Sequence, residues 1–193
     1  METAEILAFA GSLRWDSVNK KMVKVAAAAA ESAGAGVEYI DLRDFPLPIY
    51  DGDIESASGI PDAALELQDK MRRAKGFLIA SPEYNSSLSA ALKNMIDWTS
   101  RATKEHRAGA SFAGKTAVLM SASPGALGGL RGLFDVRKIL STMGVVVLPE
   151  QFALGNSMNA FDADGAMPDA DMRAKVEALG TRLAEYLASI SPR

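Results

Sequence analysis

Four short apolar runs, each followed by a segment with helical periodicity, limit the folds open to this chain. They cover residues 5–11, 76–82, 115–125 and 144–150. The runs are continuous rather than alternating, which is typical of strands covered on both faces, as parallel strands are. A fifth run, residues 37–42, mixes polar and apolar positions and therefore suits an edge strand.

The segments between these runs carry apolar residues at the spacing of an α-helix. The predicted helices follow residues 18–29, 60–74, 88–98, 130–143 and 171–190. A strand-helix unit repeated five times predicts an α/β protein with a doubly wound parallel sheet and helices on both faces. With no linker in its 193 residues, the chain is predicted to form one domain, residues 1–193. Five strands favour the flavodoxin-like order 2-1-3-4-5 over the dinucleotide-binding order.

In open parallel sheets, ligands bind beyond the carboxyl ends of the strands, where the strand order reverses. Function is therefore expected in the loops after the first, third and fourth predicted strands. The first loop, residues 10–20, combines Gly11 and short polar side chains with Arg14, whose planar fork suits a phosphate. Asp16 opposes that interpretation unless it points away, and an ordinary capped helix with a surface arginine is the alternative. The loop lacks both common nucleotide signatures, which disfavours a dinucleotide or ATP as the tightly held ligand.

The second and third loops are rich in peptide groups that a flat heterocycle could contact. Residues 81–87 follow a buried run and contain Pro82 and Tyr84, although Ser87 or Ser89 could simply cap the next helix. Residues 121–132 contain small side chains and glycines that let a ligand approach the main chain, although a flexible loop is the alternative. In the predicted strand order the three loops form one crevice.

Composition excludes several kinds of chemistry. A formal charge of −3 argues against nucleic acid or an anionic membrane as the partner, and without cysteine there is no thiolate nucleophile or dithiol centre. No run approaches the ~20 apolar residues of a membrane span and no signal segment is visible, so a cytoplasmic protein is expected. No metal site is predicted, because the acidic turn 161–171 lacks the remaining calcium ligands, and His106 is expected to be solvated. Redox chemistry would therefore need a borrowed cofactor.

The segments GSLRWDSVN, SPEYNSSLSAALKNMIDW and SASPGALGGLR, in this order and spacing, resemble the NAD(P)H-dependent FMN reductase family, which includes bacterial quinone and chromate reductases. The resemblance runs from the first strand to about Gly165 and implies a flavodoxin-like fold with non-covalent FMN and NADPH or NADH as cosubstrate. The sequence differs from the family pattern at Val18, where the family often has an aromatic residue, and at Ser89, where it often has proline. The cofactor-binding residues it implies are Ser12, Arg14, Ser17, Val18 and Asn19 around the phosphate, Pro82, Glu83, Tyr84 and Asn85 along the isoalloxazine, and Ser121, Ser123 and Gly125 closing the pocket.

The resulting hypothesis is a ping-pong oxidoreductase with no catalytic side chain, in which flavin N5 takes hydride from the nicotinamide before a quinone-like acceptor collects the electrons. A flavodoxin-like electron carrier is one alternative, although such carriers are usually more acidic. A flavin-sensing or structural module of the same fold is another. The resemblance also implies a homodimer or homotetramer, with the helix bearing Met95 and Trp98 as a candidate contact unless Trp98 belongs to the core.

Overall fold

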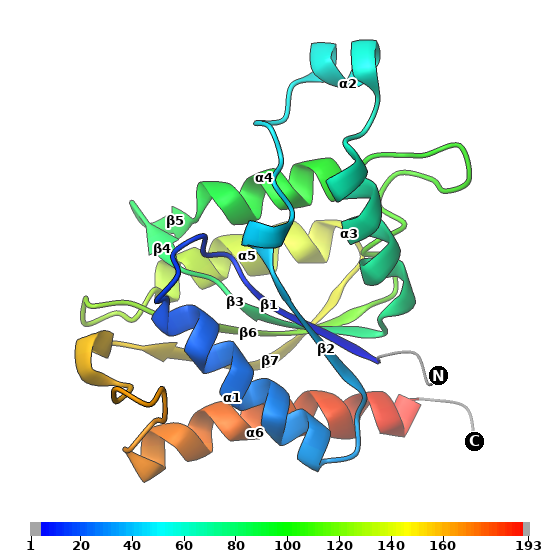
Figure 1. The fold of residues 1–193 in the computed structure, drawn as a ribbon. Coiled ribbons are helices and arrows are strands. Elements are labelled where there is room, and N and C mark those ends of the chain that lie inside the picture. The colour runs from blue at the N-terminus through cyan, green and yellow to red at the C-terminus, as the bar shows by residue number, and fades with distance from the viewer. Residues whose placement is uncertain (1–4, 191–193) are drawn as a thin grey trace.

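The computed structural model describes residues 5–190 and shows one parallel sheet between two layers of helices (Figure 1). The sheet has five strands in the order β2-β1-β3-β6-β7, with every pairing parallel. This confirms the flavodoxin-like order predicted from the sequence. The strands are β1 (Ile6–Ala10), β2 (Val37–Asp41), β3 (Gly76–Ala80), β6 (Thr116–Ala122) and β7 (Val146–Leu154).

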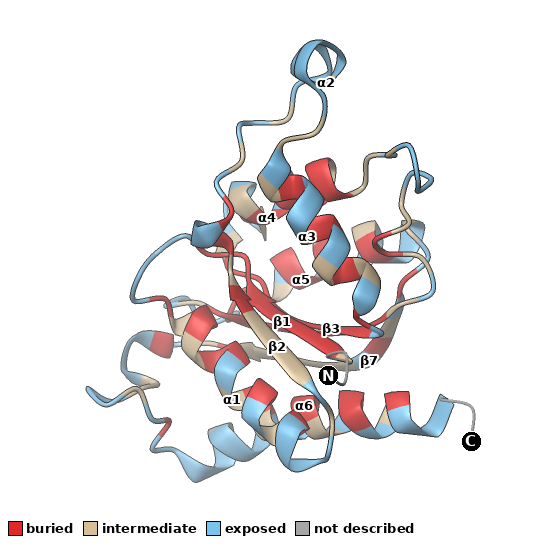
Figure 2. Cartoon of the chain, turned by 45° about the vertical axis from the view of Figure 1, so that its right-hand side comes forward, coloured by how far each residue is buried: buried red, intermediate tan, exposed pale blue. Residues whose placement is uncertain are grey.

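Alternate residues of the central strands supply two separate cores. Along β1, Ile6 and Ala8 face one layer of helices, whereas Leu7 and Phe9 face the other. All of these side chains are buried, as are the central strands in Figure 2. The first layer consists of α1 (Val18–Ser32) and α6 (Ala170–Ile190), and the second consists of α3 (Asp62–Arg73), α4 (Ala90–Thr99) and α5 (Leu130–Thr142). The predicted doubly wound arrangement is therefore confirmed.

The last strand is longer and less regular than the sequence analysis predicted. It continues to Leu154 rather than ending near residue 150, and its pairing with β6 shifts between Ala117 and Leu119. The Arg137 guanidinium of α5 donates hydrogen bonds to the carbonyl oxygens of Val147 and Leu148 at distances of 3.0 and 2.9 Å. A side chain from a neighbouring helix thus satisfies backbone groups at the irregularity, which explains why the strand tolerates it.

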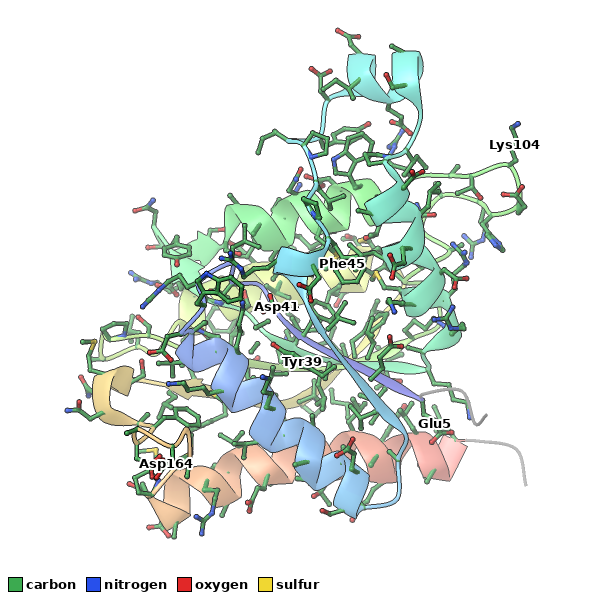
Figure 3. The ribbon with its side chains drawn as sticks, in the orientation of Figure 1. Glu5, Tyr39, Asp41, Phe45, Lys104 and Asp164 are labelled. Carbon is green, nitrogen blue, oxygen red and sulfur yellow. The ribbon has the colours of Figure 1, made fainter. Side chains whose placement is uncertain are left out.

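Two further elements are not among the strands and helices that the sequence predicted. A two-residue turn at Asn85 and Ser86 joins β4 (Glu83–Tyr84) to β5 (Ser87–Leu88), and both turn residues have positive φ angles, of 52° and 68°. This is the backbone of the tight hairpin turns that favour asparagine and glycine. The second element, α2 (Gly52–Ser58), contains no buried residue and projects from the body of the protein (Figures 1 and 3). Two short 3-10 helices, η1 (Leu42–Asp44) and η2 (Ser157–Asn159), complete the fold.

Trp98 on α4 belongs to the core rather than to an exposed contact face. Its side chain is fully buried and its indole N-H donates to the Pro48 carbonyl oxygen at 2.8 Å. Met95 is also buried. The alternative that Trp98 belongs to the core is therefore confirmed, whereas a subunit contact through other residues of α4 stays a prediction. Within residues 5–190, no helix is both long and apolar enough to cross a bilayer.

Candidate functional site

The loops after β1, β3 and β6 meet in a pocket of about 240 Å³ at the carboxyl edge of the sheet. The sequence analysis predicted that these three loops would form one crevice, and the structure brings them together. Pro124 and η2 residues Ser157 and Met158 also line it, and no sequence signal marked the contribution of η2. The predicted residues that line the pocket are Ser12, Arg14, Ser17, Val18, Asn19, Pro82, Glu83, Tyr84 and Ser123.

The N-terminus of α1 forms one side of this pocket and is suited to an anion. Ser17 occupies the N-cap position, yet its side chain makes no capping hydrogen bond, and the first turn contains no acidic residue. The first N-H groups of a helix have no partner within the helix and carry partial positive charge. Within residues 5–190, the Arg14 guanidinium makes no hydrogen bond or ion pair, so it can bind a ligand. These donors together match a phosphate group.

Asp16, which opposed a phosphate site in the sequence analysis, is neutralised by a neighbour. Its carboxylate forms an ion pair with the Lys21 ammonium at 2.5 Å and its side chain is 81% exposed. The hydrogen bond from Lys21 is the main reason that the pKa of Asp16 lies below its ordinary value. The acid therefore stays charged but is paired, which reduces its repulsion of an anion in the pocket.

Asn19 lines the pocket, but its amide is committed to the protein. Its Nδ2 donates to the carbonyl oxygen of Ala122 and its Oδ1 accepts from the Ala122 N-H, both at 2.9 Å. The side chain therefore joins α1 to the end of β6 by two hydrogen bonds. Its contribution to the site is to hold the first and third loops together, with only one amide N-H left for a ligand.

Glu83 also lines the pocket and joins the second loop to the third. Its carboxylate accepts from Arg131 Nη2 at 2.6 Å and from the Gly132 N-H, in the first turn of α5, at 2.9 Å. Burial alone would raise the pKa of Glu83, but the hydrogen bonds from Arg131 and Gly132 outweigh it, so the pKa lies below its usual 4.5. The carboxylate is therefore charged at neutral pH and fixes the hairpin that carries Tyr84.

We expect Glu83→Gln to destabilise the protein by about 1–3 kcal/mol at pH 7, because Arg131 loses its charged partner. A carboxyl whose pKa is lowered by folding stabilises the native state above its unfolded pKa, and this stabilisation is lost as the pH falls through the folded pKa. The difference in the free energy of unfolding between wild type and Glu83→Gln should therefore become smaller below about pH 4.5. Urea unfolding between pH 7 and pH 3.5 measures it, with exposed Glu105→Gln as the control. A difference in unfolding free energy that does not change with pH would show that the charge of Glu83 does not stabilise the fold.

The remaining predicted residues differ in their exposure and in whether they line the pocket. Tyr84 lies at the pocket with 51% of its surface exposed, whereas Asn85 is exposed at the hairpin turn and lines a neighbouring recess instead. Gly125 is exposed beyond Ser123, whose Oγ accepts a hydrogen bond from the Gly125 N-H at 3.2 Å. Ser121 is fully buried and does not line the pocket. All twelve predicted residues stay predictions as cofactor contacts, and the position of Ser121 outside the pocket argues against such a contact for it.

Ser121 is expected to be dispensable for ligand binding. Its Oγ is buried without a hydrogen-bond partner in the described part of the chain, beneath Gly129, where a Cβ would approach it to 1.9 Å. Ser121→Ala removes an unsatisfied hydroxyl, so the free energy of unfolding should be unchanged or higher by about 1 kcal/mol. Urea unfolding and an FMN titration check this prediction. A loss of FMN affinity in Ser121→Ala, with stability unchanged, would show that the hydroxyl contacts the ligand.

No cluster of potential metal ligands occurs among residues 5–190. A flavodoxin-like sheet with a donor-rich pocket at its switch point is typical of proteins that bind a phosphorylated cofactor. The sequence pattern of the NADPH-dependent FMN reductases matches residues 4–159, which is most of the chain. The chain belongs to this family.

Individual relatives agree with that assignment. The chain is 33% identical to an NAD(P)H-dependent FMN reductase of Pseudomonas aeruginosa, over 90% of this chain and 89% of the relative. It is 32% identical to a quinone reductase of Escherichia coli, over 80% and 78% of the two chains. A flavoenzyme NAD(P)H:(acceptor) oxidoreductase from Paracoccus denitrificans has a similar structure, with a TM-score of 0.78, 27% identity and coverage of 95% of this chain and 97% of that one.

Proposed function

We propose that this protein binds FMN and uses it to carry electrons from NAD(P)H to a quinone or a similar small oxidised acceptor. The observation that carries the proposal is the donor set at the α1 N-terminus, where the Ser17 side chain makes no capping bond and the Arg14 guanidinium makes no hydrogen bond or ion pair within residues 5–190. These donors fit the phosphate of FMN. Family membership and the similarity to quinone reductases support the activity and the class of acceptor.

The residues of the pocket would bind and orient the cofactor rather than react. When bound, FMN supplies the redox chemistry, because its N5 accepts hydride and the reduced ring can pass electrons to an acceptor. Arg14 and the first turn of α1 hold the phosphate, which fixes one end of the molecule. Pro82 and Tyr84 form a wall at the second loop, and Glu83 keeps this wall in place through Arg131. None of these side chains would need to move a proton at the nicotinamide, because its carbon gives up hydrogen and both electrons together as hydride.

The nicotinamide and the acceptor are proposed to use the same space in turn, which gives a ping-pong cycle. Tyr84 and Met158 line the pocket and are 51% and 74% exposed, so a second molecule can reach this side of it from solvent. Initial rates at several fixed quinone concentrations should give parallel double-reciprocal plots against NAD(P)H. Intersecting lines would show that both substrates bind together.

A homodimer or homotetramer is proposed in addition. Leu127, Phe134 and Met158 are more than half exposed, on or beside the loops at the carboxyl edge of the sheet. A contact between copies of the chain would cover such apolar surface. Light scattering that gives the mass of a monomer would refute this assembly.

The proposed function is tested by an anaerobic visible spectrum of the protein with one equivalent of FMN, recorded before and after NADPH or NADH is added. Rapid loss of the oxidised-flavin bands, followed by their return when a quinone is added, is the expected result. The relative rates identify the preferred nicotinamide. Bound flavin that neither nicotinamide reduces would favour an electron carrier, and failure to bind FMN would favour a structural module.

A further inference from the structure

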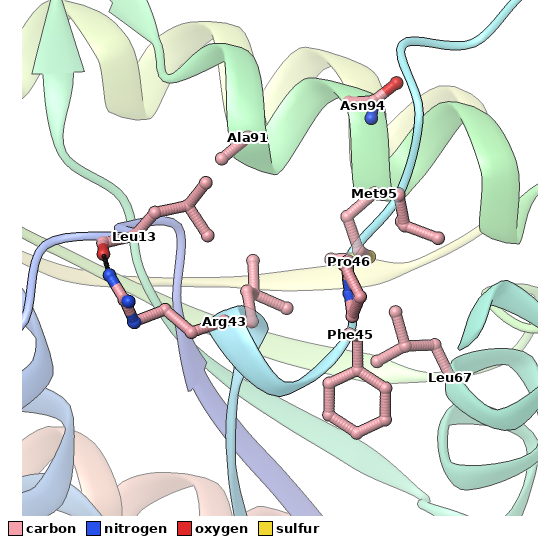
Figure 4. A pocket seen from close by; sticks show the side chains of 10 residues that line it. Leu13, Arg43, Phe45, Pro46, Leu67, Ala91, Asn94 and Met95 are labelled. Carbon is pink, nitrogen blue, oxygen red and sulfur yellow. Dashed lines mark hydrogen bonds between the residues drawn. The ribbon is translucent and has the colours of Figure 1, made fainter.

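A second recess, of about 350 Å³, lies beside the cofactor pocket between the first loop, the segment after β2 and α4 (Figure 4). We call it the apolar groove. Its walls are mainly hydrophobic side chains, some of which belong to the core beneath it. They include Leu13, Leu42, Phe45, Leu67, Ala91 and Met95. Its volume is in the range of small-molecule sites.

The two polar residues of the apolar groove already have partners within the protein. Arg43 Nη1 donates to the Leu13 carbonyl oxygen at 2.6 Å. Asn94 Nδ2 donates to the Pro48 carbonyl oxygen, and Asn94 Oδ1 accepts from the Tyr50 N-H, both at 2.8 Å. These bonds hold both polar side chains against the wall, and the other eight lining residues are apolar. The groove therefore favours an apolar occupant.

The apolar groove and the cofactor pocket each share lining residues with a recess between them. Leu13 and Ala91 also line an intervening recess that reaches Ser12, Arg14 and Tyr84. Those last three residues line the cofactor pocket as well. A ligand with a small polar head at the cofactor pocket could therefore extend an apolar chain past Ala91 into the groove.

We propose that the apolar groove binds the prenyl tail of a quinone acceptor whose ring lies at the mouth of the cofactor pocket, beside the bound FMN. This inference rests on the proposed function and names the kind of quinone that the site would select. Transfer of a methylene group from water into an apolar site strengthens binding by roughly fourfold. A tail that enters the groove should therefore lower the KM for the quinone by about tenfold or more, even if only a few of its carbons are buried.

The first experiment measures tail binding without redox chemistry. Geraniol, a ten-carbon prenyl alcohol, is titrated calorimetrically into the full chain without flavin. Ala91 is half-buried on α4, and Ala91→Phe places a large side chain in the groove. Leu47→Ser, which makes a groove wall polar, is a second variant if Ala91→Phe fails to fold. Ala174→Phe, at an exposed position of α6 on the other face of the sheet, is the matched control. Geraniol should bind to the wild type and the control but at least tenfold more weakly to the groove variants.

The second experiment compares a benzoquinone ring without a tail and the same ring with a geranyl tail, using the FMN-loaded enzyme. We expect a KM about tenfold lower for the tailed quinone in the wild type and in Ala174→Phe. This ratio should approach one in Ala91→Phe. Normal turnover of the tail-less ring with no gain from the tail would overturn the inference and leave the proposed function intact. Failure to reduce either quinone would refute the proposed function itself.

Two further results would also overturn the tail site. Geraniol that fails to bind the wild type, or binds equally to Ala91→Phe, would show that the groove does not hold a prenyl chain. If geraniol fails to bind and Ala91→Phe also lowers the mass measured by light scattering, then the groove is a contact between copies of the chain.

Discussion

Arg14→Ala is expected to weaken FMN binding by roughly 10- to 100-fold while leaving riboflavin binding almost unchanged. A hydrogen bond between charged partners contributes about 1.5–3 kcal/mol, and the guanidinium of Arg14 makes no other hydrogen bond among residues 5–190. Riboflavin lacks the phosphate and so cannot gain from Arg14. Fluorescence titrations of both flavins against wild type and variant therefore isolate the contact between Arg14 and the phosphate.

Two variants make the Arg14 experiment specific. Arg107→Ala removes a positive charge from an exposed loop outside the pocket and should change neither affinity. Arg14→Lys keeps the charge but loses the planar fork, so its FMN affinity should lie between wild type and Arg14→Ala. An equal loss of FMN and riboflavin affinity in Arg14→Ala would mean that Arg14 supports the loop rather than the phosphate. If Arg14→Ala binds FMN as tightly as the wild type, then the phosphate does not contact Arg14.

Gly180→Val is expected to have the largest effect on stability, with a loss of at least about 3 kcal/mol or no folded protein at all. Gly180 lies where α6 crosses α1, and a Cβ there would come within 1.8 Å of the Ala26 carbonyl oxygen and 2.7 Å of the Ala26 carbonyl carbon. These are backbone atoms, so no side chain can move aside. The two helices would have to separate, and the core beneath them, which includes Met22 and Leu183, would lose its packing.

Urea unfolding monitored by circular dichroism measures the effect of Gly180→Val. Gly52→Ala is the matched control, since a Cβ at Gly52, in the exposed helix α2, meets no atom within 4 Å. That variant should be neutral or slightly stabilising because alanine is the better helix former. A stable, cooperatively folding Gly180→Val protein would show that α1 and α6 can separate at little cost.

The sequence was sufficient to predict the sheet and to locate the site within it. Continuous apolar runs mark parallel strands, and strand count favours one order, so the three loops at the switch point follow from local patterns. The hairpin at Asn85 and Ser86 was missed because its strands have only two residues each. The helix α2 was missed because it buries no side chain and so carries no apolar stripe.

Only the tertiary structure determined which hydrogen-bond partners each site residue has. The sequence was sufficient to predict that Asn19, Glu83 and Ser121 lie near the carboxyl edge of the sheet. It did not reveal that Asn19 pairs with Ala122, that Glu83 binds the first turn of α5, or that Ser121 is buried without a partner. The physical reason is that strand and helix patterns arise from neighbours along the chain, whereas these hydrogen bonds join residues as many as 103 positions apart. Only the packed fold determines which polar groups pair with each other and which are left to bind a ligand.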